Sequence, residues 1–177
     1  MRKLSTSELD RISADKVNTI RKMPLVVVLD NIRSGLNVGS VFRTCDAFAV
    51  SHIFITGFTP QPPHREILKT ALGLTETVSW TYVESTEDCL KLLEKEGFYN
   101  IAIEQTTESI SLEKFVFHHD RKYALILGNE VDGVSDEAIA IADAAIEIPQ
   151  AGVKHSLNVA VCGGMVLWEA FRQLYLP

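Results

Sequence analysis

The strongest constraint on the fold is a regular alternation between short apolar runs and segments with helical spacing. Several runs, such as LVVVLD and YALILG, are apolar almost throughout, as in strands that are buried on both faces of a parallel sheet. The expected strands are 25–30, 52–57, 77–83, 100–105, 123–128 and 144–149; the expected helices are 38–49, 64–72, 85–96, 135–142 and 156–173. This alternation predicts an α/β fold with a mostly parallel sheet and helices on both faces.

The length of the chain fits one domain. The 177 residues fall within the roughly 100–200 expected of a single domain, and no internal repeat or linker divides them. We therefore expect residues 1–177 to form one domain, with 1–22 as a short basic helical extension. This extension contains Ser5 and Glu8 at the spacing of a capping box.

Composition excludes several classes of protein. No apolar run approaches the roughly 20 residues of a membrane span, and the N-terminus lacks the hydrophobic segment of a signal peptide. The three cysteines are far apart and match neither a zinc site nor a disulfide framework. His118, His119 and Asp120 lack metal-ligand spacing and are interpreted as a polar turn. The sequence thus predicts a cytoplasmic protein without a membrane segment or a metal.

Charge is distributed unevenly along the chain. The net charge of −6 speaks at first against a nucleic-acid partner. However, residues 1–72 hold ten Lys and Arg against six Asp and Glu, whereas 73–177 hold seven against seventeen. The first part could present a basic surface to RNA, although the asymmetry could also be chance.

Ligands of open α/β sheets bind at the carboxyl ends of strands, in the loops that lead into helices. The first such loop with an unusual sequence lies within residues 30–48. Asn37 is a suitable N-cap for the helix that follows. Arg43 either pairs with Asp46, three residues on, or clamps a phosphate or substrate oxyanion with two hydrogen bonds. The segment has neither the GxGxxG fingerprint nor the P-loop pattern.

The second loop lies within residues 125–137, where a buried strand ends at Gly128. Glycines at 128 and 133 permit a close approach of a ligand to the backbone, and Ser135 is expected to cap the next helix. Glu130 is either a solvated loop acid or a fixed hydrogen-bond acceptor.

The third loop precedes an apolar helix that begins with polar residues, His155, Ser156 and Asn158. A helix that is apolar on every face should be buried, so polar groups at its start need a reason. One reason is that Ser156 caps the helix and Asn158 bonds to backbone. The Gly163-Gly164 pair costs about 1 kcal/mol per glycine relative to alanine. This cost indicates a close approach by another helix or chain, or a local kink. No G-x-S-x-G pattern surrounds Ser156, which speaks against a hydrolase.

Taken together, the three loops resemble the three motifs of the SpoU (TrmH-like) branch of the SPOUT RNA methyltransferases. The matching segments are NVGSVFRTCDAF (37–48), LILGNEVDGVSDE (125–137) and IPQAGVKHSLNVAV (148–161), and the resemblance covers residues 24–173. It implies an α/β domain with a deep C-terminal trefoil knot and a homodimer formed through the knot region. It also implies S-adenosylmethionine (AdoMet) as cofactor and methylation of a ribose 2′-hydroxyl in tRNA or rRNA.

The resemblance also implies roles for individual residues. The catalytic group would be Asn37, Arg43, Glu130, Ser156 and Asn158. The cofactor would lie against Glu104, Gln105, Leu127, Gly128, Asn129, Ile148, Gln150, Ser156 and Leu157. Gln150 departs from the family, in which a methionine is common at this position.

The resemblance implies a specific chemical role for Arg43. Family accounts make this arginine the base, but a guanidinium is effectively always protonated. We therefore expect Arg43 to hold the adjacent phosphate and to stabilise negative charge on the ribose oxygen, in its own or the partner subunit's site.

Two alternative functions remain open from the sequence. The main one is a non-catalytic RNA- or cofactor-binding relative, and the other is a Rossmann-type nucleotide enzyme, against which the missing glycine fingerprint speaks. Substrate recognition is expected from the N-terminal helix, residues 59–70 and the second subunit.

Overall fold

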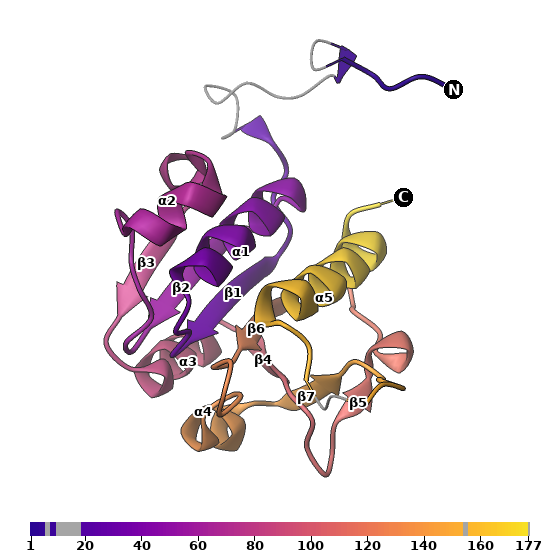
Figure 1. Ribbon diagram of the computed structural model, residues 1–177. Coiled ribbons are helices and arrows are strands. Elements are labelled where there is room, and N and C mark those ends of the chain that lie inside the picture. The colour runs from indigo at the N-terminus through magenta and orange to yellow at the C-terminus, as the bar shows by residue number, and fades with distance from the viewer. Residues whose placement is uncertain (6–7, 10–18, 154–155, 177) are drawn as a thin grey trace.

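A computed structural model describes residues 1–5, 8–9, 19–153 and 156–176, and contains one seven-stranded sheet (Figure 1). The strand order is β3-β2-β1-β6-β4-β7-β5, and every neighbouring pair is parallel. The strands are β1 (Leu25–Asp30), β2 (His52–Thr56), β3 (Trp80–Val83), β4 (Phe98–Ile103), β5 (Ile110–Ser111), β6 (Lys122–Leu127) and β7 (Ala144–Glu147). The helices are α1 (Gly35–Ala47), α2 (Arg65–Ala71), α3 (Thr86–Lys95), α4 (Asp136–Ile141) and α5 (Val159–Leu174). The described residues also form short 3₁₀ turns at η3 (Leu74–Glu76) and η4 (Leu112–Lys114).

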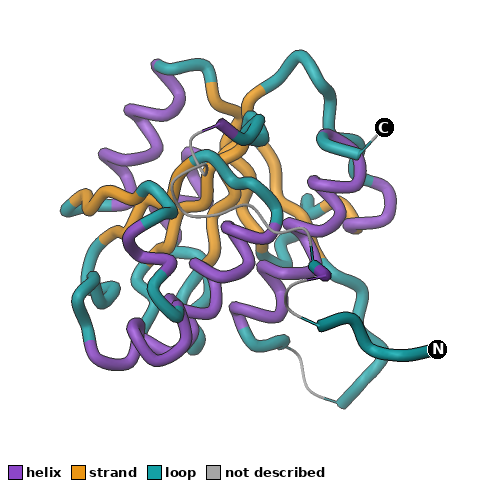
Figure 2. The backbone as a smooth tube through the Cα atoms, turned by 90° about the horizontal axis from the view of Figure 1, so that it is seen from above, coloured by secondary structure: helices purple, strands orange, loops and turns teal. Residues whose placement is uncertain are grey.

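Helices cover both faces of this sheet, which confirms the predicted α/β class (Figure 2). Alternate residues of β1 point to opposite faces of the sheet and belong to two separate cores. Leu25, Val27 and Leu29 belong to the core beneath α1, α2 and α5. Val26 and Val28 join the core beneath α3 and α4. Burial on both faces explains why β1 is apolar throughout instead of alternating.

Helices α1 and α5 lie side by side and run in the same direction (Figure 1). At their starts, the Asn158 side chain donates a hydrogen bond to Asn37 Oδ1 at 3.1 Å. At their ends, the ring of Phe48 lies 5.9 Å from that of Trp168 and 5.3 Å from that of Phe171. This arrangement brings the first and third sequence motifs together at one end of the two helices.

Two predicted helix caps are wrong. The N-cap of α1 is Ser34, whose hydroxyl accepts a hydrogen bond from Asn37 N at 3.3 Å, so Asn37 is already helical. The N-cap of α5 is Asn158, whose Oδ1 accepts from Ala160 N at 3.0 Å, so Ser156 lies two residues before the cap. In each region two good capping residues stand close together, and propensity alone does not choose between them. Ser135 occupies the N-cap position of α4 without a side-chain cap bond.

Element boundaries also differ from the sequence prediction. The strand expected at 77–83 begins at Trp80, because the η3 turn precedes it. The strand expected at 100–105 is 98–103, and β5, of two residues, was not predicted. Half of the predicted basic N-terminal extension, residues 6–7 and 10–18, lies outside the described residues. In the described part of the proposed capping box, Glu8 Oε2 accepts from Ser5 N at 2.8 Å.

Helix α5 is not buried on every face within one chain, so this expectation is wrong for the single subunit. Val161, Met165 and Trp168 are 50%, 42% and 48% exposed. Gly163 packs against a strand and not a helix: a Cβ there would lie 2.8 Å from Leu127 Cδ1. Gly164 faces open space. Among the described residues, no helix combines the length and apolarity required of a membrane span.

Candidate functional site

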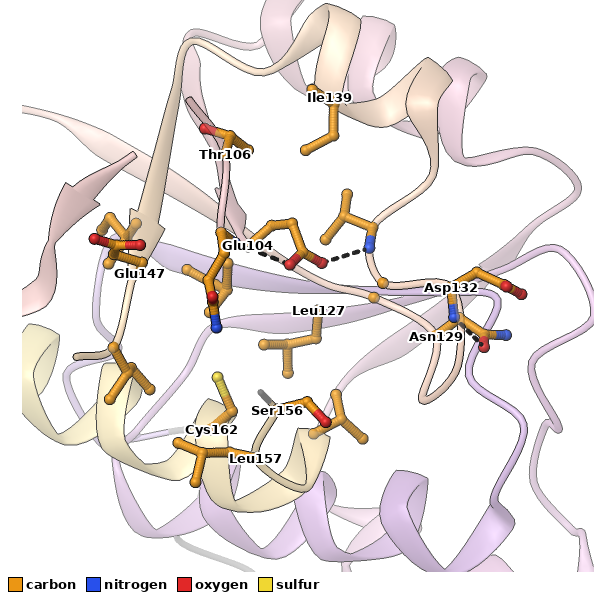
Figure 3. A pocket seen from close by; sticks show the side chains of 18 of the residues that line it. Glu104, Thr106, Leu127, Asn129, Asp132, Ile139, Glu147, Ser156, Leu157 and Cys162 are labelled. Atoms are coloured by element: carbon orange, nitrogen blue, oxygen red, sulfur yellow. Dashed lines mark hydrogen bonds between the residues drawn. The ribbon is translucent and has the colours of Figure 1, made fainter. Parts of the chain in front are cut away.

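A cavity of about 890 Å³ lies at the carboxyl ends of β4, β6 and β7, beside the start of α5 (Figure 3). Its walls come from three regions that are distant in sequence: 103–107, 127–139, and 146–150 together with 156–162. All nine residues predicted to contact a cofactor line it: Glu104, Gln105, Leu127, Gly128, Asn129, Ile148, Gln150, Ser156 and Leu157. The chain therefore gathers these residues around one space at the sheet edge where ligands of such folds bind.

The wall formed by residues 128–134 is a closed loop. Asn129 N donates to Gly133 O at 2.8 Å, and Gly133 N donates back to Asn129 O at 3.0 Å. The Asn129 side chain accepts from Val131 N at 2.8 Å. A Cβ on Gly128 would overlap the carbonyl carbon of Gly133 and the nitrogen of Val134. Only glycine therefore fits at position 128, and Asn129 serves the loop's own structure.

Glu104 fixes this loop from the opposite wall (Figure 3). Its carboxylate accepts from Val134 N at 3.0 Å and from Gln105 N at 2.8 Å. Cys162, on α5, also lines the cavity; burial and, to a lesser extent, the Glu104 charge raise the pKa of its thiol to about 11. At neutral pH this thiol is protonated and is no nucleophile.

Glu130 links the cavity to the start of α1. Its carboxylate accepts from the backbone N–H groups of Arg33 at 2.8 Å and Ser34 at 3.0 Å. It also accepts from the Asn37 amide at 2.8 Å. Burial alone would raise the pKa of Glu130, but these hydrogen bonds outweigh it and lower the pKa below its ordinary value. Glu130 is therefore a fixed hydrogen-bond acceptor, the second of the two alternatives left open above.

Known proteins are similar to this chain in sequence and in fold. A sequence profile of the SpoU rRNA Methylase family matches residues 24–168. The chain belongs to this family. The resemblance drawn from the three motifs is thus confirmed.

Named relatives of this SpoU chain act on RNA. A tRNA (guanosine(18)-2'-O)-methyltransferase of Aquifex aeolicus is 34% identical over 159 residues, which are 86% of this chain and 71% of the relative. The 23S rRNA (guanosine-2'-O-)-methyltransferase RlmB of Vibrio cholerae is 30% identical over 97% of this chain and 66% of its own length. An AdoMet-bound rRNA methyltransferase from Sinorhizobium meliloti superposes with a TM-score of 0.80 at 29% identity, covering 89% of this chain and 60% of that one.

The SpoU chain brings four of its five predicted catalytic residues to one place. Glu130, Asn37 and Asn158 are linked by hydrogen bonds, and Ser156 lines the cavity beside them. Arg43 does not line the cavity. It lies on α1, about 9 Å along the helix axis from Asn37. Its side chain is exposed, and within the described part of the chain it makes no ion pair, so the expected pairing with Asp46 is absent.

A buried carboxylate that was not predicted as a site residue also shapes this region. Asp30 is fully buried and accepts from Thr86 Oγ1 at 2.6 Å and from Ser135 N at 2.7 Å. It thereby joins the starts of α3 and α4 to the end of β1. An acid at the end of an apolar strand was the available signal, because a buried charge needs such partners. Within the described residues, no three His, Cys, Asp or Glu side chains gather as metal ligands.

Replacing Glu130 with Gln should remove a pH-dependent part of the free energy of unfolding. Because the folded-state pKa is lowered, the stabilisation is fully present above the unfolded-state pKa, about 4.3, and is lost as the pH falls through the folded value. The difference in unfolding free energy between wild type and Glu130→Gln, measured by urea denaturation, should therefore be largest at neutral pH and shrink towards pH 3. The exposed Glu94→Gln variant is the control. A difference that stays constant with pH would contradict this account.

Proposed function

We propose that this protein transfers the methyl group of AdoMet to a ribose 2′-hydroxyl of tRNA or rRNA. Family membership supports the reaction class, and the named relatives methylate guanosines of both RNA types. The observation that carries the proposal is the cavity, because residues of the second and third motifs and of 103–107 line one space. Asn37 of the first motif lies beside it, hydrogen-bonded to Glu130 and Asn158.

The cavity fits AdoMet in size and in chemistry. Its volume lies within the roughly 300–1,000 Å³ of ordinary small-molecule sites. Aliphatic side chains suited to an adenine ring line it: Leu127, Ile139, Ile146, Ile148 and Leu157. Carboxylates suited to a cationic sulfonium and ammonium also line it: Glu104, Glu130, Asp132, Asp136 and Glu147.

In this proposal the protein's own residues orient and stabilise the reacting ribose. Bound AdoMet supplies a methyl group that is already electrophilic. The methyl group would pass from the sulfonium sulfur to the ribose oxygen, and the hydroxyl proton would pass to water. Glu130 is a poor base, because its lowered pKa and three hydrogen-bond donors leave the carboxylate little affinity for a proton.

The remaining side chains have separate roles. Glu130 and Asn158 hold the Asn37 amide from both sides, which positions Asn37 beside the cavity. Ser156 orients the substrate at the rim. Arg43 stabilises the negative charge that develops on the ribose oxygen, which a fixed guanidinium can do without changing protonation.

We propose that two chains form a homodimer through α5 and the neighbouring face of α1. Exposed apolar side chains recur along one side of α5 at the helical spacing of Val161, Met165 and Trp168. Gly164 leaves open space between them for a second helix. Arg43 lies on the exposed face of the adjacent α1 and does not line its own chain's cavity, which favours a role in the partner's site.

Replacing Met165 with Glu should separate the dimer, because two charges would be buried at the centre of the apolar stripe. We expect a shift from dimer to monomer in light scattering after size-exclusion chromatography, together with loss of methyl transfer. Leu92→Glu, an exposed leucine on α3, is the matched control and should leave the mass unchanged. A Met165→Glu protein that remains a dimer would refute this interface.

Methyl transfer to RNA tests the proposed function. The protein, isotope-labelled AdoMet and total RNA are incubated, and calorimetry measures AdoMet binding alone. Binding with transfer supports the enzyme, whereas binding of AdoMet and RNA without transfer identifies the non-catalytic relative.

We also propose that residues 1–177 act as one catalytic domain and that the protein acts in the cytoplasm, where RNA substrates are available. The trefoil knot stays a prediction.

A further inference from the structure

A basic surface with one exposed aromatic ring adjoins the cavity. We name it the loop face; its residues are Arg33, Phe58, His64, Arg65 and Lys69. Phe58 is 63% exposed, and the other four side chains are exposed as well. Neither the two arginines nor Lys69 forms an ion pair with any described carboxylate. These cations are therefore available to an anionic partner.

The loop face is joined directly to the proposed catalytic group. Phe58 N donates to Asn31 Oδ1 at 3.3 Å, and the backbone carbonyl of Asn31 accepts from the cavity residue Asn129 at 2.7 Å. Two residues further along the chain, the backbone N–H of Arg33 donates to Glu130. A molecule that lies on this face therefore also reaches the rim of the cavity.

The two loops that carry Arg33 and Phe58 are held in fixed conformations, and the second loop leads into α2, which carries Arg65 and Lys69. Ile32 N donates to Thr59 Oγ1 at 2.8 Å, and the Tyr82 hydroxyl donates to Gly57 O at 3.1 Å. Gly57 adopts a φ of 60°, and a Cβ there would overlap the Asn31 side chain. A preformed surface loses little conformational freedom on binding, which favours a recognition role.

We propose that the loop face binds unpaired nucleotides that flank the target ribose; this inference rests on the proposed function. Phe58 stacks on a base, while Arg65, Lys69 and Arg33 contact phosphates. The base must be unpaired, because an exposed ring needs a free base face and a duplex hides those faces. Charge favours this side of the molecule, since residues 31–72 hold four Arg and Lys against two Asp and Glu, whereas residues 73–177 are strongly acidic.

Anisotropy titrations with a fluorescein-labelled, mixed-sequence single-stranded RNA of about 16 nucleotides test the proposal, since such sites span about 4–16 nucleotides. Phe58→Ala should weaken binding about tenfold without changing the salt dependence, and Phe58→Tyr should restore affinity. Arg65→Glu should weaken binding and reduce the slope of log K against log salt by about 0.7, the value expected for one lost phosphate contact. The matched controls are Leu92→Ala, which removes an exposed apolar side chain elsewhere, and Lys95→Glu, at the opposite edge of the sheet.

Two results would overturn the inference. One is wild-type affinity in Phe58→Ala and Arg65→Glu, and the other is tighter binding of the same RNA as a duplex. Calorimetric titration with AdoMet should give the same Kd for all variants. If the wild type methylates RNA while the loop-face variants bind it normally, this inference fails and the proposed function stands. If the variants lose RNA binding while the wild type transfers no methyl group, the proposed function fails and the loop face stands.

Discussion

Replacing Arg43 with Ala should lower kcat by about 10²–10³, because removing one donor that stabilises charge in a transition state costs roughly 3–4 kcal/mol. Fold and AdoMet binding should not change, since the side chain is exposed, makes no ion pair within the described residues and does not line the cavity. Single-turnover methyl transfer at saturating AdoMet measures the effect, with the exposed Arg121→Ala as control.

Arg43→Lys distinguishes a bidentate clamp from a simple positive charge. Lysine keeps the charge but not the planar pair of donors, so most of the lost rate should not return. Near-normal turnover of Arg43→Lys with intact RNA binding would contradict the proposed role.

The second large effect is expected at Gly128. A Cβ at this position would overlap backbone atoms of Gly133 and Val134, which cannot move without breaking the bonds that close the loop. Overpacking against flexible side chains costs about 1–3 kcal/mol, and backbone is less able to yield. Gly128→Ala should therefore weaken AdoMet binding by about 100-fold or more, which corresponds to about 2.7 kcal/mol.

Calorimetric titration of AdoMet into the folded variant measures this loss, and circular dichroism confirms the fold. Gly152→Ala is the matched control, because a Cβ there meets no atom within 4 Å and the residue does not line the cavity. Equal AdoMet affinities for Gly128→Ala and wild type would show that the loop does not form the cofactor site.

The two variants together locate Arg43 in the dimer. An Arg43→Ala chain keeps its cavity, and a Gly128→Ala chain keeps its arginine. If Arg43 serves the partner's site, an equal mixture of exchanging chains contains mixed dimers with one complete site, and about one quarter of wild-type activity should return. If Arg43 serves its own site, no mixed dimer is complete and activity should stay low.

Local sequence pattern predicted the sheet well where burial was uniform. The run at 25–30 coincides with β1, because every residue is buried and the apolar pattern leaves no ambiguity. Capping residues were predicted less well: Ser34 and Asn37 both suit an N-cap, and only the folded backbone selects the first. β5 was missed because two residues are too few to show a period.

The site was predictable through its motifs but not through its contacts. The bond from Asn37 to Glu130 joins residues 93 positions apart, and that from Asn158 to Asn37 joins residues 121 apart. No local pattern contains such pairings. The sequence likewise shows that the α5 segment is apolar. Which of its sides stays exposed depends on how the helix packs against β6 and α1.

The position of the transferred methyl group tests the central claim most directly. RNA that has been labelled by the protein with methyl-tritiated AdoMet is hydrolysed in alkali, which cleaves the chain only where a free 2′-hydroxyl can attack the neighbouring phosphate. We predict that the label resides in alkali-resistant dinucleotides. Label in mononucleotides, which would indicate methylated bases, or an absence of label with every RNA tried, would contradict a site built for the ribose hydroxyl.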